Sequence, residues 1–288
     1  MTRPSPDDRS ALPALFVSHG SPMIALEPGA AGAFLGELGT ALTARWGRPR
    51  AVLAISAHTT ARAPVALAAP QHEAIYDFGD FDPRLNTLRY DAPGDPALAE
   101  RAVALLALAG IPSQKLPQGG LDHGIWTALR YLLPEADVPV VPLAFVPTSS
   151  PAQQLALGAA LAPLRREGVL VLGTGSITHN LRRVFAGGRA TPVDQPEIEE
   201  SAAFRTWMAE RSAARDWEAL ADYRRQAPHA VDMHPTDEHL LPWFVAAGAG
   251  GREAAPQRLH QSVTYGCLGM DVYAFGDGSA ALAHALRG

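Results

Sequence analysis

Short apolar segments alternate with longer segments of helical periodicity along most of this chain. Three segments, 12–18, 51–57 and 169–174, are almost entirely apolar. They predict β-strands covered on both faces, because a strand with one face in water would alternate apolar and polar residues. The same reasoning, with less regular patterns, predicts further strands at 65–68, at 138–146 and, as one strand or a strand pair, at 263–275.

The intervening segments have the spacing of helices. The segment 96–109 is rich in Ala and Leu, with Asp95 placed to cap its start and Gly110 to end it. The segment 201–225 reads as one long amphipathic helix. The other helices are expected at 30–46, 124–133, 151–166 and 238–247. Pro142 lies inside the strand at 138–146, and since proline cannot donate a ladder hydrogen bond, it favours an edge strand or a bulge there.

This order of elements predicts an α/β fold with a mainly parallel central sheet that is flanked by helices on both faces. No repeat and no Gly/Ser-rich or charged linker divides the chain. We therefore expect a flexible N-terminal tail at 1–12, rich in Pro, Asp and Ser, followed by a single catalytic α/β domain over 13–288.

Composition narrows the classes of function. The 288 residues are 47% hydrophobic and 18% charged, with a net charge of −5, so a large core is available. No basic run or stripe suggests a nucleic-acid partner. The single cysteine, Cys267, excludes an intrachain disulfide framework and a cysteine-based structural metal site. The apolar runs are too short for a membrane span, and the polar start is no signal peptide, so a cytoplasmic location is the default expectation. A homo-oligomer remains open.

The strongest chemical signal is positional. Three apolar strands run directly into a histidine, at His19, His58 and His179. Ligands of open α/β sheets bind outside the carboxyl ends of the strands, so these imidazoles can converge on one point. Histidine is both a common metal ligand and the usual acid–base group near neutral pH. Three in the same structural position favour a shared site over three unrelated loop residues.

A fourth candidate element is the segment HPTDEHLLPWF. Pro235 and Thr236 resemble a helix entry, where capping and the helix dipole fully explain Asp237. Glu238 and His239 offer two metal ligands at this helix start. Since adjacent helical residues point about 100° apart, only one of the two is expected to reach a given ion.

The segment LDHGIWTAL is the fifth element. Asp122 can cap the helix that follows, and it can equally orient a neighbouring imidazole, as carboxylates near metal ligands do. His123 would then lie at the mouth of the same helix, within reach of a bound ligand. His229 and His234 precede the fourth element, where they either line a substrate pocket or face solvent.

Taken together, the motifs resemble a known family. SHGSP, SAH, DHGIW, GTGSITHNL, HPTDEHLLP and YGCLGMDVYAF, in this order, look like the DOPA-dioxygenase-type branch of the class III extradiol ring-cleavage dioxygenases. The resemblance runs from about Pro13 to Phe275. It implies a single α/β domain with a non-haem metal, Fe²⁺ for catalysis, and a site that Zn²⁺ often occupies in isolated proteins.

The resemblance also implies roles for individual residues. His19, His58 and His239 correspond to metal ligands, with Glu238 as the competitor of His239. His179 corresponds to the acid–base residue, which also approaches the metal when substrate is absent, and His123 to a group that hydrogen-bonds substrate. Substrate-binding or supporting positions are expected at Asp122, His229 and Glu238. Thr59 and Cys267 stand where many members carry an aromatic residue and a serine.

The implied activity is extradiol cleavage of a catechol, such as a DOPA-like or related 3,4-dihydroxyphenyl compound, with O₂ as co-substrate. Oxygen insertion beside the diol gives a lactone, whose hydrolysis yields a muconic semialdehyde. Two alternatives stay open. The first is a zinc-dependent hydrolase that uses the same histidines, although no HExxH spacing supplies a carboxylate base. The second is a non-catalytic protein that binds a metal or a small molecule.

Overall fold

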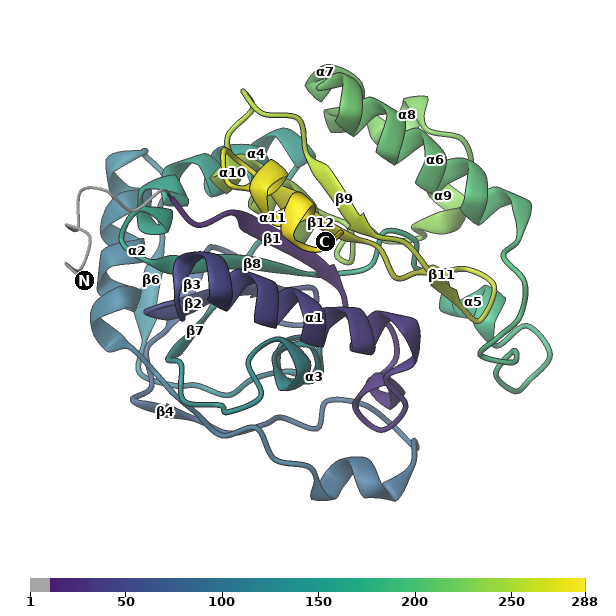
Figure 1. Cartoon of the computed structure of the whole chain (residues 1–288), viewed down its shortest axis with the longest axis horizontal. Helices are drawn as coiled ribbons and strands as arrows, with labels where there is room; N and C mark the ends of the chain where they lie inside the picture. Colours follow the sequence, from purple (N-terminus) through teal and green to yellow (C-terminus); the bar gives the residue numbers. More distant parts are fainter. Residues whose placement is uncertain (1–10, 288) are drawn as a thin grey trace.

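A mixed eight-stranded sheet forms the centre of the molecule (Figure 1). The computed structural model describes residues 11–287. Pairing is parallel between β1, β8, β2 and β7 and between β3 and β6, and antiparallel between β7 and β3 and along β1, β12 and β9. In spatial order the strands are β6 (Gln114–Leu116), β3 (Val65–Leu67), β7 (Val140–Ala144), β2 (Ala51–Ser56), β8 (Val169–Gly175), β1 (Ala14–Ser18), β12 (Val272–Phe275) and β9 (Gln257–His260).

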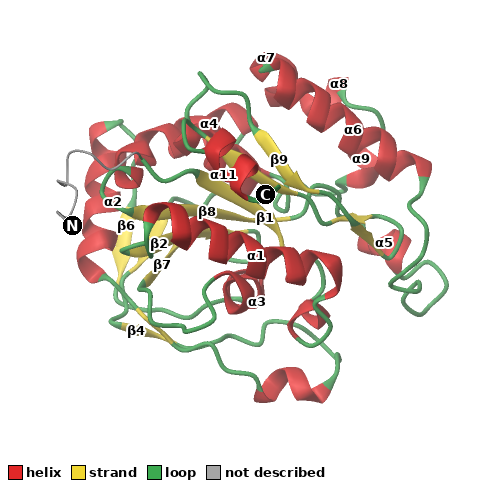
Figure 2. Ribbon diagram, viewed as in Figure 1, coloured by secondary structure: helices red, strands yellow, loops and turns green. Residues whose placement is uncertain are grey.

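Helices cover both faces of this sheet, as Figure 2 shows. Along β1, Phe16 faces one buried cluster and Leu15 the other, and Leu53 and Val52 of β2 divide in the same way. Both sides of each strand are therefore buried, which explains the absence of polar alternation in the sequence. One layer holds α1 (Gly29–Trp46), α3 (His123–Leu132) and α11 (Ser279–Ala285), and the other holds α2 (Pro96–Leu108), α4 (Pro151–Leu161) and α10 (Leu241–Gly250). The predicted fold class is confirmed.

The predicted helix at 201–225 is wrong, because the chain breaks it twice. Arg215 adopts a left-handed backbone conformation with φ of 56°, which ends the first helix. Asp216 then caps the next helix by accepting a hydrogen bond from the backbone of Ala219. The segment forms α6 (Glu199–Ala214), α7 (Trp217–Ala221) and α8 (Tyr223–Gln226), which gather with α9 (Ala230–Met233) at one end of the molecule (Figure 2).

Pro142 marks neither an edge strand nor a bulge, because the pairings of β7 with β2 and β3 show no register shift, so that prediction is wrong as well. Strand β7 lies inside the sheet, between β3 and β2. Its pairing with β3 involves only Leu143 and Ala144, which follow the proline. Because Pro142 faces no ladder partner on that side, its missing N–H costs no hydrogen bond.

Several short elements escaped prediction because two to five residues carry too little periodicity. They are the strands β4 (Gln71–His72), β5 (Ala92–Pro93), β6 and β9, the helix α5 (Leu181–Val184), and 3₁₀ turns at Pro22–Ala25 and Pro83–Thr87. The segment predicted as a strand or a strand pair at 263–275 forms β10 (Val263–Thr264), β11 (Leu268–Gly269) and β12, and the helix predicted at 151–166 ends as a 3₁₀ turn at Ala162–Arg165. The predicted tail at 1–12 falls mostly outside the described residues. Its last two residues, Ala11 and Leu12, are buried. In the described part of the chain, no helix has both the length and the apolar character to cross a bilayer.

Candidate active site

The central strands deliver three histidines to one edge of the sheet. Strands β2, β8 and β1 are neighbours and run parallel, so their carboxyl ends meet at the same edge. His19 follows β1 directly, His58 lies two residues beyond β2, and His179 lies four residues beyond β8. The side chains of His58, His123, His179 and His239 all border one cavity at this edge. The buried ring of His19 lies beside them, with centroids 5.1 Å from His58 and 5.6 Å from His239.

The pair formed by His19 and His58 has the geometry of two ligands of one cation. Their Nε2 atoms are 3.1 Å apart. Thr174 donates its hydroxyl proton to the carbonyl of Gly124 and accepts a hydrogen bond from Nδ1 of His19. Nδ1 of His19 therefore carries the proton, which leaves a lone pair on Nε2. Two imidazole nitrogens about 2.1 Å from a metal, at a right angle, would be about 3 Å apart.

His239 lines the same cavity, and Glu238 contacts its ring. Nδ1 of His239 lies 3.1 Å from Oε1 of Glu238, so this imidazole too is left with a free Nε2. The ring of His239 stacks on that of His179, with centroids 3.5 Å apart. His179, Glu238 and His239 form one group whose ligand atoms lie within 4.8 Å of one another, and His19, His58 and His123 form another.

The local backbone at Glu238 differs from the sequence expectation. Helix α10 begins only at Leu241, with Pro242 in its first turn and without a side-chain cap. Thr236 donates to Glu238 rather than capping a helix, and Asp237 accepts from Tyr223 and Arg224. The predicted helix entry at 236–238 is therefore wrong. Because Glu238 and His239 are not on a helix, the 100° rule does not apply, and both side chains reach the same group.

Two glycines permit the close approach of these segments. A Cβ on Gly175 would lie 2.0 Å from the carbonyl oxygen of His239, which accepts a hydrogen bond from the next residue, Ser176. A Cβ on Gly124 would lie within 3 Å of Ser56 and of the ring of His19. The glycines of the GTGS and DHG motifs thus let His239 and His19 pack against β8 and α3.

His123, the first residue of α3, has a carboxylate partner that the sequence did not single out. Asp77 accepts hydrogen bonds from the backbone N–H of His123, at 2.9 Å, and from Nδ1 of its ring, at 3.0 Å. Burial alone would raise the pKa of Asp77, but the bonds and charge of His123 outweigh it and lower that pKa. Asp77 lies in a long irregular segment, where spacing carries no signal.

Asp122 takes the capping role and not the predicted contact with an imidazole. It accepts from the backbone of Ile125 at the start of α3, and also from the hydroxyls of Ser56 and Thr59. These two hydroxyls flank His58, so Asp122 fixes the loop rather than the ring. Among the described residues, the carboxylates that contact the site imidazoles are Asp77 and Glu238. Burial, opposed by these hydroxyl bonds, raises the pKa of Asp122.

Burial keeps the imidazoles of His19, His58, His179 and His239 neutral. It is the largest cause of a pKa of about 4 for His58 and about 3 for His179, and neighbouring imidazoles add to the effect. The pKa values of His19 and His239 are lowered well below their usual range for the same reasons. At neutral pH these groups therefore present lone pairs, which is the form that binds metals.

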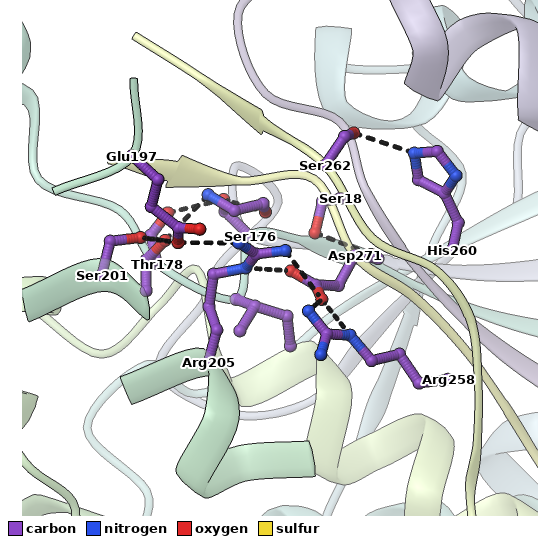
Figure 3. A network of polar contacts seen from close by, with 12 residues as sticks. Ser18, Ser176, Thr178, Glu197, Ser201, Arg205, Arg258, His260, Ser262 and Asp271 are labelled. Atoms are coloured by element: carbon purple, nitrogen blue, oxygen red, sulfur yellow. Dashed lines mark hydrogen bonds and ion pairs between the residues drawn. The ribbon is translucent and has the colours of Figure 1, made fainter. Parts of the chain in front are cut away.

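A buried ion network contacts the segments that lead into His19 and His179 (Figure 3). The guanidinium of Arg205 contacts Asp271 at 2.7 Å and Glu197 at 2.7 Å, and Arg258 also pairs with Asp271. Burial alone would lower the pKa of Arg205, but Asp271 and Glu197 outweigh it and raise that pKa. The backbone carbonyl of Asp271 accepts bonds from both the N–H and the hydroxyl of Ser18, next to His19.

The same network extends to the loop of His179. Glu197 accepts from Ser201, whose hydroxyl lies 3.4 Å from that of Thr178. Thr178 in turn accepts from the backbone of Gly269. Helix α6, through its Arg205 and Ser201, thus links the segment that follows β11 to the residues just before His19 and His179.

Four residues named from the sequence do not line the cavity. His229 is exposed at the start of α9 and does not line the cavity. His234 is fully buried, with Nε2 2.7 Å from the carbonyl oxygen of Ile177. Cys267 packs with Val184 and Leu268, and burial raises its pKa to about 11. Neither Cys267 nor Thr59 lines the cavity.

The donor set fits a metal ion. Several neutral imidazoles converge, and acceptors hold Nδ1 of His19, His123 and His239, so that their Nε2 atoms are left free. Nitrogen ligands of this kind suit iron and zinc alike. Thiolate ligands are absent from the described part of this site.

The sequence matches one protein family and several characterised relatives. Residues 13–276 match the family described as the catalytic LigB subunit of aromatic ring-opening dioxygenase. A 4,5-DOPA dioxygenase extradiol from Beta vulgaris is 35% identical, over 90% of this chain and 95% of that protein. One from Escherichia coli K12 is also 35% identical, over 83% of this chain and 85% of that protein.

The fold agrees with these matches. The crystal structure of an uncharacterized protein from Escherichia coli K12 superimposes with a TM-score of 0.71 and 28% identity, over 92% of this chain and all of that one. The resemblance read from the motifs is therefore confirmed. The chain belongs to the LigB family of aromatic ring-opening dioxygenases, which are non-haem metal enzymes, and it is a ring-cleaving dioxygenase.

Proposed function

We propose that this enzyme opens the ring of a catechol beside its diol, with O₂ as co-substrate and Fe²⁺ as the catalytic metal. The single observation that carries the proposal is the 3.1 Å separation of the Nε2 atoms of His19 and His58, beside His239 in a cavity that admits a ligand. We assign His19, His58 and His239 as the metal ligands. Zn²⁺ would bind the same nitrogens.

A metal bound there would lower the pKa of the catechol hydroxyls and provide a centre at which O₂ can react. The protein supplies the proton chemistry. His179 is neutral at pH 7, so its imidazole can accept the proton of a catechol hydroxyl. The bond from Nδ1 of His123 to Asp77 leaves Nε2 of His123 to accept a hydrogen bond from the substrate.

Anaerobic reconstitution with Fe²⁺, followed by aerated buffer and a panel of 3,4-dihydroxyphenyl compounds, tests the proposal. We expect one O₂ consumed per catechol and a yellow ring-opened product. The absence of O₂ uptake with every catechol would overturn it. Activity with Zn²⁺ alone and without O₂ would instead indicate the zinc hydrolase, which the matches to dioxygenases do not favour.

A variant pair separates the assigned roles. His179→Gln should lower kcat by about 10²–10⁴-fold, the range of general acid–base catalysis, while the protein keeps its iron. His19→Ala should lose the iron itself. Iron content measured on both proteins distinguishes a base from a ligand, and an iron-free His179→Gln protein would contradict the assignment.

A further inference from the structure

The cavity beyond the histidines is larger than a bare catechol requires. Its volume is about 600 Å³, which lies in the range of pockets that enclose drug-sized ligands. The histidines occupy one side. The remaining lining is mainly apolar and includes Phe78, Phe81, Leu181, Phe185 and Tyr265. A catechol bound at the histidines would therefore direct a ring substituent toward apolar side chains.

Several of these side chains are unusually exposed. Leu181 is 48% exposed, Phe185 46% and Phe81 38%. Among the described residues only eight large hydrophobic side chains are this exposed, and three of them border this one cavity. Exposed apolar side chains that gather at a cavity indicate a surface that an apolar ligand covers.

The charged groups of the cavity argue against an anionic substituent. Within the described residues the lining contains two carboxylates, Asp77 and Asp80, and neither lysine nor arginine. Asp77 is occupied by His123. The nearby Arg183 of α5 pairs with Asp232 and Glu200, and neither it nor the exposed Arg182 and Arg189 lines the cavity. A carboxylate on the substituent would lose water without gaining a cationic partner, which is unfavourable.

We propose that the preferred substrate is a catechol whose ring substituent is apolar and carries no carboxylate. This inference rests on the proposed ring cleavage and narrows its substrate class. Leu181 and Phe185 are the residues that select the substituent, while the histidines bind the diol.

A matched pair of substrates tests the charge preference. We expect kcat/KM of the Fe²⁺ enzyme to be at least about tenfold higher for the methyl ester of 3-(3,4-dihydroxyphenyl)propionate than for the free acid. For 4-alkylcatechols, kcat/KM should rise about fourfold for each added methylene that is buried. An acid that is cleaved as well as its ester, or better, would overturn the inference.

Variants test the assignment to named side chains. Leu181→Arg should raise kcat/KM for the acid relative to the ester, and Phe185→Ser should remove most of the gain from longer alkyl chains. Leu108→Ser is the matched control, because Leu108 is 83% exposed on α2 and does not line the cavity. If both cavity variants kept the wild-type ratios, the assignment would be wrong.

A binding measurement separates this inference from the proposed reaction. Calorimetric titration of the Zn²⁺-loaded protein under nitrogen gives the Kd of the ester and of the acid without turnover. Tighter binding of the ester supports the inference even if no catechol is opened, an outcome that would overturn only the proposed reaction. Tighter binding of the acid contradicts the inference whether or not rings are opened.

Discussion

Single residues around the cavity divide into imidazoles and the acceptors that orient them. Thr174 orients His19, Asp77 orients His123, and Glu238 orients His239. Each acceptor binds Nδ1 and so fixes which nitrogen is left for a metal or a substrate. The chemistry of the site therefore depends on these acceptors as well as on the imidazoles.

Asp77 offers a direct test of this dependence. Asp77→Ala should lower kcat/KM by about 10- to 100-fold, because His123 loses the acceptor that fixes its tautomer. Steady-state O₂ consumption measures the effect. The control is Asp91→Ala, which removes an exposed carboxylate that does not line the cavity. Equal activity of the two variants would show that Asp77 does not position His123.

His234 should make stability depend on pH. Burial is the largest cause of its lowered pKa, about 4, and Arg224 lowers it further, against the smaller opposing effects of the Ile177 carbonyl and of Asp237 and Glu238. The unfolded chain takes up this proton near pH 6.5. Between pH 6.5 and 4 the unfolded state therefore binds more protons than the folded state. The stabilisation that neutral His234 contributes is complete above pH 6.5 and is lost as pH falls toward 4.

The variant His234→Gln isolates this effect. Between pH 6.5 and 4, its free energy of unfolding should fall less steeply than that of wild type, by up to about 1.4 kcal/mol per pH unit. Urea denaturation of both proteins, with chelator present throughout, measures the two slopes. Identical slopes would show that His234 remains neutral in both states or is protonated in both.

The sequence predicted correctly that histidines following parallel strands come together at one edge of the sheet. His19, His58 and His179 were identified because each follows an apolar strand, and the structure brings them to the same edge of the sheet. Asp77 was missed because it lies in an irregular segment whose path depends on tertiary contacts. His234 was expected to line a pocket or face solvent, and it is buried against the carbonyl of Ile177.

At the scale of elements, strands were predicted more accurately than helix boundaries. A fully buried strand imposes an apolar run, whereas the break at Arg215 depends on one left-handed residue inside a continuous helical pattern. The late start of α10 has a similar cause, because Asp237 binds Tyr223 and Arg224 instead of capping. Neither partner is near Asp237 in the sequence pattern.

Arg205 of helix α6 pairs with Asp271, the residue before β12. Removing this guanidinium should lower the free energy of unfolding. Arg205→Met leaves the fully buried Asp271 with only Arg258, and we expect a loss of about 3 kcal/mol in the free energy of unfolding. Arg183→Met is the matched control, because its ion pairs are exposed and should contribute about 0–1 kcal/mol. Urea denaturation that gives equal losses for the two variants would contradict this role.

On the scale of the whole molecule, the site exists because parallel strands end together. Neighbouring β2, β8 and β1 supply His58, His179 and His19, while the segment before α10 supplies His239 from a distant part of the sequence. No short stretch of chain contains the site. Its parts meet only when the sheet and both helix layers are formed.

The most direct test is the crystal structure of the protein loaded with Fe²⁺ under nitrogen, with anomalous diffraction at the iron edge. The account predicts one strong peak about 2.0–2.2 Å from Nε2 of both His19 and His58, with His239 as the third ligand. A peak bound elsewhere, or one whose ligands include only one of His19 and His58, would contradict it.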